Sequence, residues 1–297
     1  MELPSLEIIQ RGGHGPMKIK GGNSRFIRLA LSYLVLIVIA VCSLYPALWV
    51  ILSSLRPGTA LYSPTLIPEQ FTIAHYKELF INPSFRYGVW YINTLKIATL
   101  TMIFSTILIT LSMYALSRFR FRGRKNILTT MLVLGMFPGF MSMIAIFIFL
   151  FQLNLLDTHA ALILVYSSGS VLGGFIVKGF YDTIPRSLDE AARIDGASHM
   201  QVFTKIMLPL SRPILTYVAL TSFTGAWVDF IFARLVLRSK ENWTLAVGMW
   251  DLVSTYQNSN FTLFAAGAVL IAIPITLLFI FLQRFLVQGM MSGASKG

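Results

Sequence analysis

The sequence predicts an all-α integral membrane protein with six transmembrane helices. Three observations lead to this fold class. First, 56% of the 297 residues are hydrophobic and only 12% are charged, which is more apolar surface than a soluble domain of this length buries. Second, the apolar residues come in runs long enough to cross about 30 Å of hydrocarbon. Third, basic residues gather between alternate runs, as the positive-inside rule describes.

Six apolar runs are predicted to span the membrane, and the third contains an irregular point. Phe137-Pro138-Gly139 lies near the middle of that run. We expect a kink there and not a turn, because Pro and Gly are tolerated in a membrane helix that packs against neighbours. The predicted spans are 29–55, 97–117, a segment within 126–156, 160–177, 214–233 and 263–283.

The distribution of Lys and Arg predicts the orientation and the domain organisation. With a cytoplasmic N-terminus, 17 of the 24 Lys and Arg residues fall in cytoplasmic segments, so we expect both termini inside. The basic run at 118–125 is then a topology anchor and not a nucleic-acid patch. We expect a cytoplasmic arm at 1–28, a six-helix membrane domain at 29–283 and a cytoplasmic tail at 284–297.

Residues that would drive transport or catalysis are scarce in this sequence. Asp229 is the one ionisable residue in the predicted spans, whereas ion-coupled carriers usually hold such residues at mid-membrane. It lies near the outer end of its span, which favours an interfacial position over a translocation path. The sequence has no HExxH, GxSxG or GxxxxGK[ST] motif, and its four histidines lack metal-ligand spacing. We expect no cofactor, no metal and no chemistry by the chain itself.

The segment SLDEAARIDGASHMQVFTKIMLPLSRP, at 187–213, lies on the predicted cytoplasmic side and begins with a short helix. Ser187 and Glu190 fit a capping box at its start. Gly196 suits the left-handed turn that ends a helix. The pattern therefore predicts a helix followed by a glycine elbow.

A second short helix is predicted after the elbow. Ser198 and Gln201 repeat the capping box at its start. The helix should stop around Leu208, because Pro209 disfavours helix in the residue before it. Each of the two helices carries a narrow apolar stripe, formed by Leu188, Ala191 and Ala192 in one and by Met200, Phe203, Ile206 and Met207 in the other. Such stripes either pack under the protein's own helices or dock into the groove of a separate cytoplasmic subunit.

The same segment resembles the EAA loop of binding-protein-dependent ABC importer permeases. The pattern of that loop is E-A-A-x-x-x-G and, after nine further residues, I-x-L-P. It is matched here by Glu190, Ala191, Ala192, Gly196, Ile206, Leu208 and Pro209. The stretches NTLKIATL, YALSRFRFRGR, GMFPGF, TLAVGM and QRFLVQGMMSGASKG resemble the maltose-type sugar permeases with six spans. The resemblance therefore extends over nearly the whole chain.

The resemblance implies a type I ABC importer permease fold and a division of labour. In that family, such a permease pairs with a second, homologous permease on a dimer of ATPase subunits, and an extracytoplasmic binding protein delivers the sugar. The EAA helix couples closure of the ATPase dimer to movement of the spans. The coupling residues implied here are Glu190, Ala191, Ala192, Asp195, Gly196, Ile206, Leu208 and Pro209. For Glu190, the role of capping partner competes with that of coupling contact.

Two further regions resemble parts of the family. The tail at 288–297 resembles one that inserts between ATPase subunits, with a disordered end as the alternative. The outer loop at 244–260 resembles one that probes the sugar cleft of the binding protein, with a simple connector as the alternative.

The predicted function is import of maltose or malto-oligosaccharides by a non-catalytic permease subunit in a bacterial or archaeal inner membrane. Another sugar or a glycerol-phosphate-like polyol is the alternative within this class. A secondary carrier is the alternative from a different class, and it is disfavoured because the sequence shows no mid-membrane charge and no inverted repeat.

Overall fold

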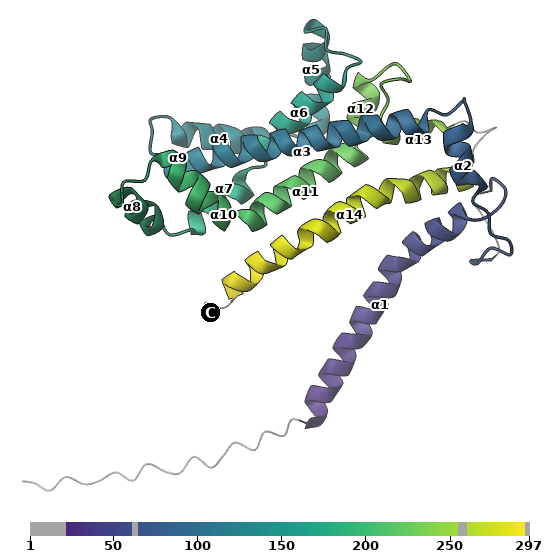
Figure 1. Cartoon of the computed structure of the whole chain (residues 1–297), viewed down its shortest axis with the longest axis horizontal. Coiled ribbons are helices and arrows are strands. Elements are labelled where there is room, and N and C mark those ends of the chain that lie inside the picture. Colours follow the sequence, from purple (N-terminus) through teal and green to yellow (C-terminus); the bar gives the residue numbers. More distant parts are fainter. Residues whose placement is uncertain (1–21, 61–64, 255–259, 295–297) are drawn as a thin grey trace, which may run out of the picture. The chain divides into compact units, whose positions relative to one another are not determined.

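The structure is a computed structural model that describes residues 22–60, 65–254 and 260–294, and it contains only helices and loops in those ranges. This confirms the predicted all-α fold class. The helices, labelled in Figure 1, are α1 (Gly22–Ser54), α2 (Ala74–Ile81), α3 (Tyr87–Arg118), α4 (Arg124–Gly135), α5 (Gly139–Gln152), α6 (His159–Leu172), α7 (Phe175–Thr183), α8 (Arg186–Ile194), α9 (His199–Val202), the π-helix η1 (Phe203–Met207), α10 (Leu208–Leu210), α11 (Arg212–Val228), α12 (Ile231–Val236), α13 (Leu245–Asp251) and α14 (Phe261–Ala294).

The chain divides into two units, residues 1–49 and 50–297. The first unit contains most of α1. The segment Phe26–Ser54 of this helix has a mean hydropathy of 2.6, and its apolar side chains are exposed along most of its length. Length and composition therefore suit the first predicted membrane span.

The second unit contains further helices that are suited to a membrane. Two unbroken helices are long and apolar enough to cross it, namely α3 and Phe261–Leu286 of α14. Three further pairs of helices are long and apolar enough to cross the membrane only when the two helices of each pair are counted together. Their bends are 104° between α4 and α5, 46° between α6 and α7, and 76° between the α9–α10 segment and α11. The chain has six spans if each bent pair crosses the membrane once.

The prediction of a kink in the third span is wrong, because the chain breaks there. α4 ends at Gly135, α5 begins at Gly139, and the two helices are 104° apart. Pro138 between them has an extended ψ of 127°, and it has no amide hydrogen with which to continue the helical ladder. Met136 and Phe137 are 77% and 59% exposed, so within the described part of residues 50–297 no helix covers them to support a continuous span.

The fifth predicted span also ends earlier than expected, at Val228. The next residue, Asp229, is extended, with a ψ of 124°. Its carboxylate accepts hydrogen bonds from the hydroxyl of Tyr166 (2.6 Å) and from the backbone amide of Ala233 (2.9 Å). Asp229 thus ties the end of α11 to α6 and to the first turn of α12.

Helix α3 organises the second unit, since it packs along α11, α6 and α7. The hydrophobic core has one cluster around Trp90 and Trp227 and another around Met113, Tyr181 and Met207. Figure 1 shows α8 and α9 at one end of α3, and α2 and α13 at the other end. The loops predicted to lie on the two sides of the membrane are therefore at opposite ends of this unit.

The segment between α12 and α13, residues 237–244, is here called the outer segment, and hydrogen bonds fix it to the start of α3. The indole Nε1 of Trp90 donates to the carbonyl of Lys240 (2.8 Å). The Nδ2 of Asn93 donates to the carbonyls of Glu241 (2.7 Å) and Trp243 (3.0 Å). The outer segment and the first turns of α3 consequently form one rigid body.

Asp157, in the loop after α5, binds the same outer segment. Its carboxylate accepts hydrogen bonds from the amides of Arg238 (2.8 Å) and Ser239 (3.0 Å) and from the hydroxyl of Ser239 (2.6 Å). Burial raises the pKa of this carboxyl group, but these hydrogen bonds lower it by more, so the pKa lies below its ordinary value of 3.8. Folding therefore favours the ionised form of Asp157.

We expect Asp157→Asn to lower the thermal midpoint of the purified protein more at pH 7 than at pH 3. The stabilisation from a lowered pKa is complete above the unfolded-state value and is lost as the pH falls through the folded-state value. The wild-type and variant midpoints should therefore converge as the pH falls below 3.8. Glu69→Gln is the matched control, because Glu69 is exposed and makes no hydrogen bond or ion pair with the described residues. A constant difference between Asp157→Asn and wild type at all pH values would contradict this account.

Candidate functional site

The first helix of the predicted EAA-like segment forms, but without the predicted capping box. α8 begins at Arg186, its N-cap residue is Pro185, and no side chain caps it. Pro185 has the extended backbone typical of a residue before a helix, and the helix starts two residues too early for Ser187 to be its cap. The capping role predicted for Glu190 is therefore wrong, and its side chain is exposed.

The elbow after α8 has the predicted left-handed conformation. Gly196 has a φ of +87°. The amide of Ala197 donates to the carbonyl of Ala192 (2.9 Å), and the amide of Gly196 donates to that of Arg193 (3.1 Å). This is the Schellman arrangement that satisfies the last carbonyls of a helix. The prediction for Gly196 is confirmed.

The second helix begins as predicted and ends later than predicted. The capping box of Ser198 and Gln201 is present, with hydrogen bonds of 2.7 and 3.3 Å. The helical run then continues as η1 and α10 past Pro209, and Leu208 keeps helical angles (φ −60°, ψ −47°). The prediction of an end around Leu208 is wrong. The wider turn of the π-helix η1, which ends two residues before the proline, accommodates its ring, and the run ends at Leu210.

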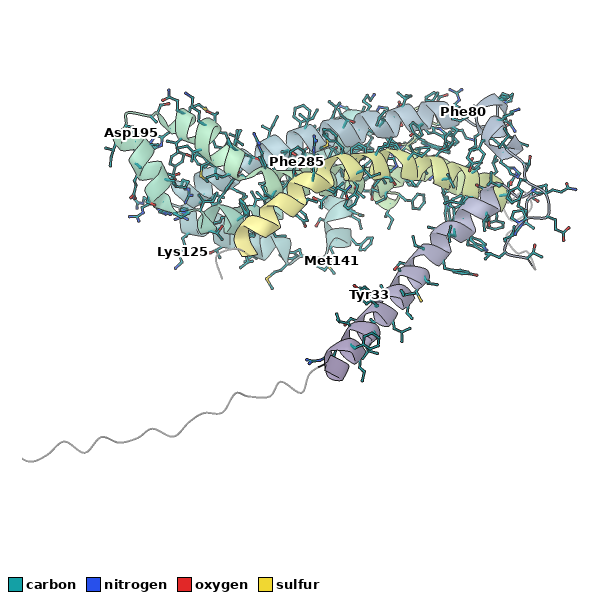
Figure 2. All side chains as sticks on the ribbon, turned by 60° about the horizontal axis from the view of Figure 1, so that its bottom comes forward. Tyr33, Phe80, Lys125, Met141, Asp195 and Phe285 are labelled. Carbon is teal, nitrogen blue, oxygen red and sulfur yellow. The ribbon has the colours of Figure 1, made fainter. Side chains whose placement is uncertain are left out.

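The structure separates the eight predicted coupling residues into two sets. The exposed residues are Glu190, Ala191, Asp195, Gly196 and Pro209, and the half-buried residues are Ala192, Ile206 and Leu208. Figure 2 shows Asp195 at the end of the second unit opposite Phe80. Apart from Pro209, the exposed residues therefore lie on α8 and its elbow. The half-buried residues hold these elements to the core.

Apolar side chains near the elbow also point in two directions. Ile194 and Met200 are 87% and 64% exposed, whereas Phe203 and Met207 are 8% and 0% exposed. The inward residues belong to the core cluster that contains Tyr181. The predicted stripe of the second helix thus packs partly under this protein's own helices, while Ile194 before the elbow and Met200 after it are exposed apolar side chains.

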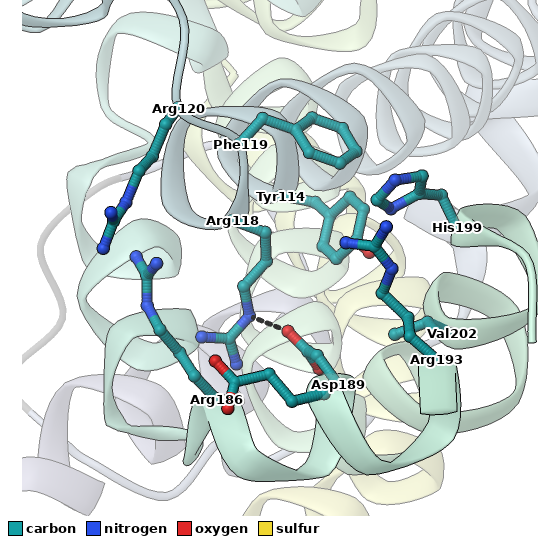
Figure 3. Close-up of a pocket in the computed structure, with 10 residues that line it drawn as sticks. Tyr114, Arg118, Phe119, Arg120, Arg186, Asp189, Arg193, His199 and Val202 are labelled. Atoms are coloured by element: carbon teal, nitrogen blue, oxygen red, sulfur yellow. Dashed lines mark ion pairs between the residues drawn. The ribbon is translucent and has the colours of Figure 1, made fainter. Parts of the chain in front are cut away.

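A cleft of about 370 Å³ lies between the end of α3 and helices α8 and α9 (Figure 3). Its walls carry mostly charged side chains. The lining residues are Tyr114, Arg118, Phe119, Arg120, Arg186, Asp189, Glu190, Arg193, His199 and Val202. In the cleft, the Nε of Arg118 and the Oδ2 of Asp189 form an ion pair of 2.9 Å, and the two side chains are 5% and 15% exposed.

Two more contacts join α3 to the segment around the elbow. A terminal guanidinium nitrogen of Arg186 donates to the carbonyl of Ser117 (3.0 Å). The rings of Phe119 and His199 meet edge to face, with centroids 5.1 Å apart. The cleft is therefore a joint between α3 and the two short helices, and among the described residues no group of His, Cys, Asp and Glu in the molecule is arranged to hold a metal ion.

Sequence reasoning missed both members of the buried ion pair. Arg118 is the first residue of the basic run that was interpreted as a topology anchor, and Asp189 lay inside the predicted capping box. One signal was available, because Asp189 and Ala192 are three residues apart and share a face of α8. A carboxylate on the apolar face of a helix indicates a buried cation nearby.

The tail and the outer loop lie only partly within the described residues. Helix α14 extends to Ala294, and residues 295–297 are outside the described part of the chain. The outer loop contains α13, and residues 255–259 are likewise outside it. The predicted contacts of the tail with the ATPase and of the loop with the binding protein remain predictions.

Comparison with known proteins gives a consistent result. The chain is 44% identical over 275 residues to the galactooligosaccharides transport system permease protein GanQ of Bacillus subtilis, and the aligned region covers 92% of this chain and 97% of GanQ. It is 40% identical over 276 residues to the maltodextrin transport system permease protein MalD of Streptococcus pneumoniae, and this alignment also covers 92% of this chain and 97% of the relative. It is 38% identical over 292 residues to the maltose/maltodextrin permease MalG of Salmonella typhimurium, and the alignment covers 93% of this chain and 98% of that permease.

The fold and the family follow from two further comparisons. A solved bacterial ABC transporter involved in import of the polysaccharide alginate has a chain that superposes with a TM-score of 0.76 at 23% identity, covering 90% of this chain and 98% of that one. This confirms the ABC importer permease fold. The model of the family described as "Binding-protein-dependent transport system inner membrane component" matches residues 107–292. Because that match covers more than half of the chain, this multi-pass membrane protein belongs to the family of binding-protein-dependent transport system inner membrane components.

Proposed function

We propose that this chain is a permease subunit of an ATP-driven sugar importer, in which a separate dimer of ATPase subunits hydrolyses ATP. The observation that carries the proposal is the exposed element formed by α8, the Gly196 elbow and α9. α8 has nine residues and the run of α9, η1 and α10 has twelve, so both are too short to be stable alone in water. The exposed Ile194 and Met200 beside the elbow suit docking of a helix into a groove.

Within this element, we assign the contacts with the ATPase to the exposed residues Glu190, Ala191, Asp195 and Gly196. The half-buried Ala192, Ile206 and Leu208, together with Pro209, hold the element in position on the rest of the chain. Both assignments follow the match to the EAA pattern and the exposure of each residue.

A second, homologous permease is proposed as the partner inside the membrane. α4 and α5 present apolar side chains that the described helices of residues 50–297 leave uncovered. On and between these helices, the residues more than half exposed are Leu132, Met136, Phe137, Phe140, Met141, Ile144, Phe149 and Phe151. We propose that 29–283 is the membrane domain that takes part in this pairing, flanked by a cytoplasmic arm at 1–28 and a cytoplasmic tail at 284–297.

The proposed substrate is a neutral oligosaccharide. Malto-oligosaccharides were predicted from the sequence, and two of the similar permeases are named for maltodextrin or maltose transport. The 44% identity to a permease named for galactooligosaccharides favours galacto-oligosaccharides as a second candidate. An extracytoplasmic binding protein delivers the sugar, in line with the name of the family.

The deciding experiment is ATP hydrolysis by the complex reconstituted in lipid with its ATPase, partner permease and binding protein. Maltotriose, a galacto-oligosaccharide and glycerol 3-phosphate should be compared at equal concentration. Stimulation by either oligosaccharide supports the proposal and selects the candidate. A wild-type complex that copurifies with no ATPase, or that responds only to glycerol 3-phosphate, contradicts it.

The proposed orientation has its own test. A reporter fused after Arg124 or after Gly297 should be cytoplasmic, and one fused near Gln257 should be extracytoplasmic, because most basic residues then lie inside. Paired reporters that are active on opposite sides of the membrane, such as alkaline phosphatase and a fluorescent protein, give a signal at each site. A cytoplasmic signal near Gln257 would overturn the orientation.

A further inference from the structure

Arg118, the last residue of α3, contacts three separate segments of the joint. Its Nε pairs with the carboxylate of Asp189 on α8 (2.9 Å). A terminal nitrogen donates to the carbonyl of Ile184, in the turn before α8 (2.9 Å), and the same nitrogen lies 3.5 Å from the sulfur of Met207 in η1. With only 5% of its side chain exposed, Arg118 connects the end of α3 to the segments on both sides of the elbow.

Helix α8 has few other contacts that fix its direction, apart from the hydrogen bond of Arg186 to the carbonyl of Ser117 on α3 (3.0 Å). None of its nine residues is fully buried, and Ala192 is the one residue of α8 that is packed against the core cluster of Tyr181 and Met207. The charges of Arg118 and Asp189 lie 2.9 Å apart with 5% and 15% of their side chains exposed, and removing one partner leaves an unpaired charge with little access to water. The Arg118–Asp189 pair, together with the Arg186 contact, therefore holds α8 against the end of α3.

Helix α3 is suited to carry a movement of α8 across the unit. It is unbroken over 32 residues, whereas α4–α5, α6–α7 and the α9–α11 segment are each bent by 46° or more. At its other end, Trp90 and Asn93 hold the outer segment before α13. A rigid helix with fixed contacts at both ends passes displacement from one to the other, provided that the contact at the α8 end holds.

We propose that Arg118 and Asp189 are positioning residues that connect the coupling helix α8 rigidly to α3, so that movement at the ATPase reaches the outer segment. This rests on the proposed function, in which α8 docks on the ATPase. Neither residue matches the EAA pattern, and neither needs to touch the ATPase or the sugar. Their loss should therefore separate ATP hydrolysis from transport without releasing the ATPase.

The test compares Arg118→Met, Asp189→Asn and Asp189→Glu with the matched control Arg120→Met. Arg120 lines the same cleft two residues further on, is exposed, and makes no ion pair with the described residues. Each variant complex is purified, its ATPase content is measured, and sugar uptake per ATP hydrolysed is determined in proteoliposomes. We expect full ATPase content and a fall of about fivefold or more in this ratio for Arg118→Met and Asp189→Asn. Asp189→Glu should recover part of it, and Arg120→Met should match wild type.

The outcomes separate this inference from the proposed function. If the wild-type complex neither retains an ATPase nor takes up sugar, the proposed function fails. If the wild type is active and Asp189→Asn keeps the wild-type ratio, the positioning role is wrong, whatever the yield of Arg118→Met. An equal loss of ATPase content in Asp189→Asn and Asp189→Glu would likewise overturn the inference, because it would make Asp189 a docking contact.

Discussion

Gly196→Val is expected to give a membrane-inserted subunit that has lost coupling between ATP hydrolysis and sugar uptake. The φ of +87° at Gly196 lies where a β-branched residue is strained, by about 1–3 kcal/mol. No atom lies within 4 Å of a Cβ built there, so the cost comes from the backbone conformation and not from a clash. The chain relieves this strain by changing the angle between α8 and α9, while the membrane helices still insert through their own hydrophobicity.

Two controls make this prediction specific. Asn adopts the left-handed conformation more readily than other residues, so Gly196→Asn should retain most of the uptake. Gly58 has a φ of +89° and is equally free of neighbours within 4 Å, but it lies in the loop after α1. Gly58→Val should therefore carry similar strain and leave coupling intact. The measurements are ATPase retention, sugar-stimulated hydrolysis and uptake, and wild-type values for all three in Gly196→Val would show that the elbow is dispensable.

Gly248→Ala is expected to be strongly destabilising at the opposite end of the unit. A Cβ at this position of α13 would lie 2.1 Å from Cε3 of Trp90. The Trp90 ring cannot move aside easily, because it is 1% exposed and its Nε1 is bonded to the carbonyl of Lys240. Overpacking of this kind costs about 1–3 kcal/mol, and each kcal/mol lowers the Tm by about 2–4 °C for a domain of this size.

The matched control is Gly225→Ala in α11, where no atom lies within 4 Å of the added Cβ. This change should be neutral or slightly stabilising, since Ala is the better helix former by about 1 kcal/mol. Thermal unfolding of the purified chain in detergent compares the two variants. Equal midpoints would mean that α13 is free to shift away from α3, and the outer segment would then not be rigid.

The sequence was most informative where one residue decides the local conformation. Gly196 and the Ser198 box were predicted correctly, because a missing Cβ and a side-chain cap act within a few residues of the chain. The errors at Phe137-Pro138-Gly139 and at Pro209 have a common cause. A proline removes one hydrogen-bond donor, but the surrounding structure decides whether the chain breaks, bends or widens into a π-helix.

The buried joint could not be predicted, because it depends on segments that are distant in the sequence. Arg118 and Asp189 are about seventy residues apart, and only packing of α3 against the helices around the elbow brings them within 2.9 Å. The sequence predicted membrane helices, and its resemblance to the EAA loop implied that residues of α8 and the elbow contact an ATPase, which stays a prediction. It did not predict which side chains attach α8 and the elbow to the rest of the molecule.

The break between α4 and α5 has a consequence for the biogenesis of the subunit. Twelve and fourteen residues of helix are roughly 18 and 21 Å long, so neither half spans a bilayer core of about 30 Å by itself. The carbonyls of Gly135, Met136 and Phe137 accept no backbone hydrogen bond from the described residues, and lipid offers no donor in exchange. In a newly made subunit the break is therefore unfavourable in lipid until another protein surface covers it. The lifetime of the subunit in the cell should depend on how quickly it assembles with the rest of its complex.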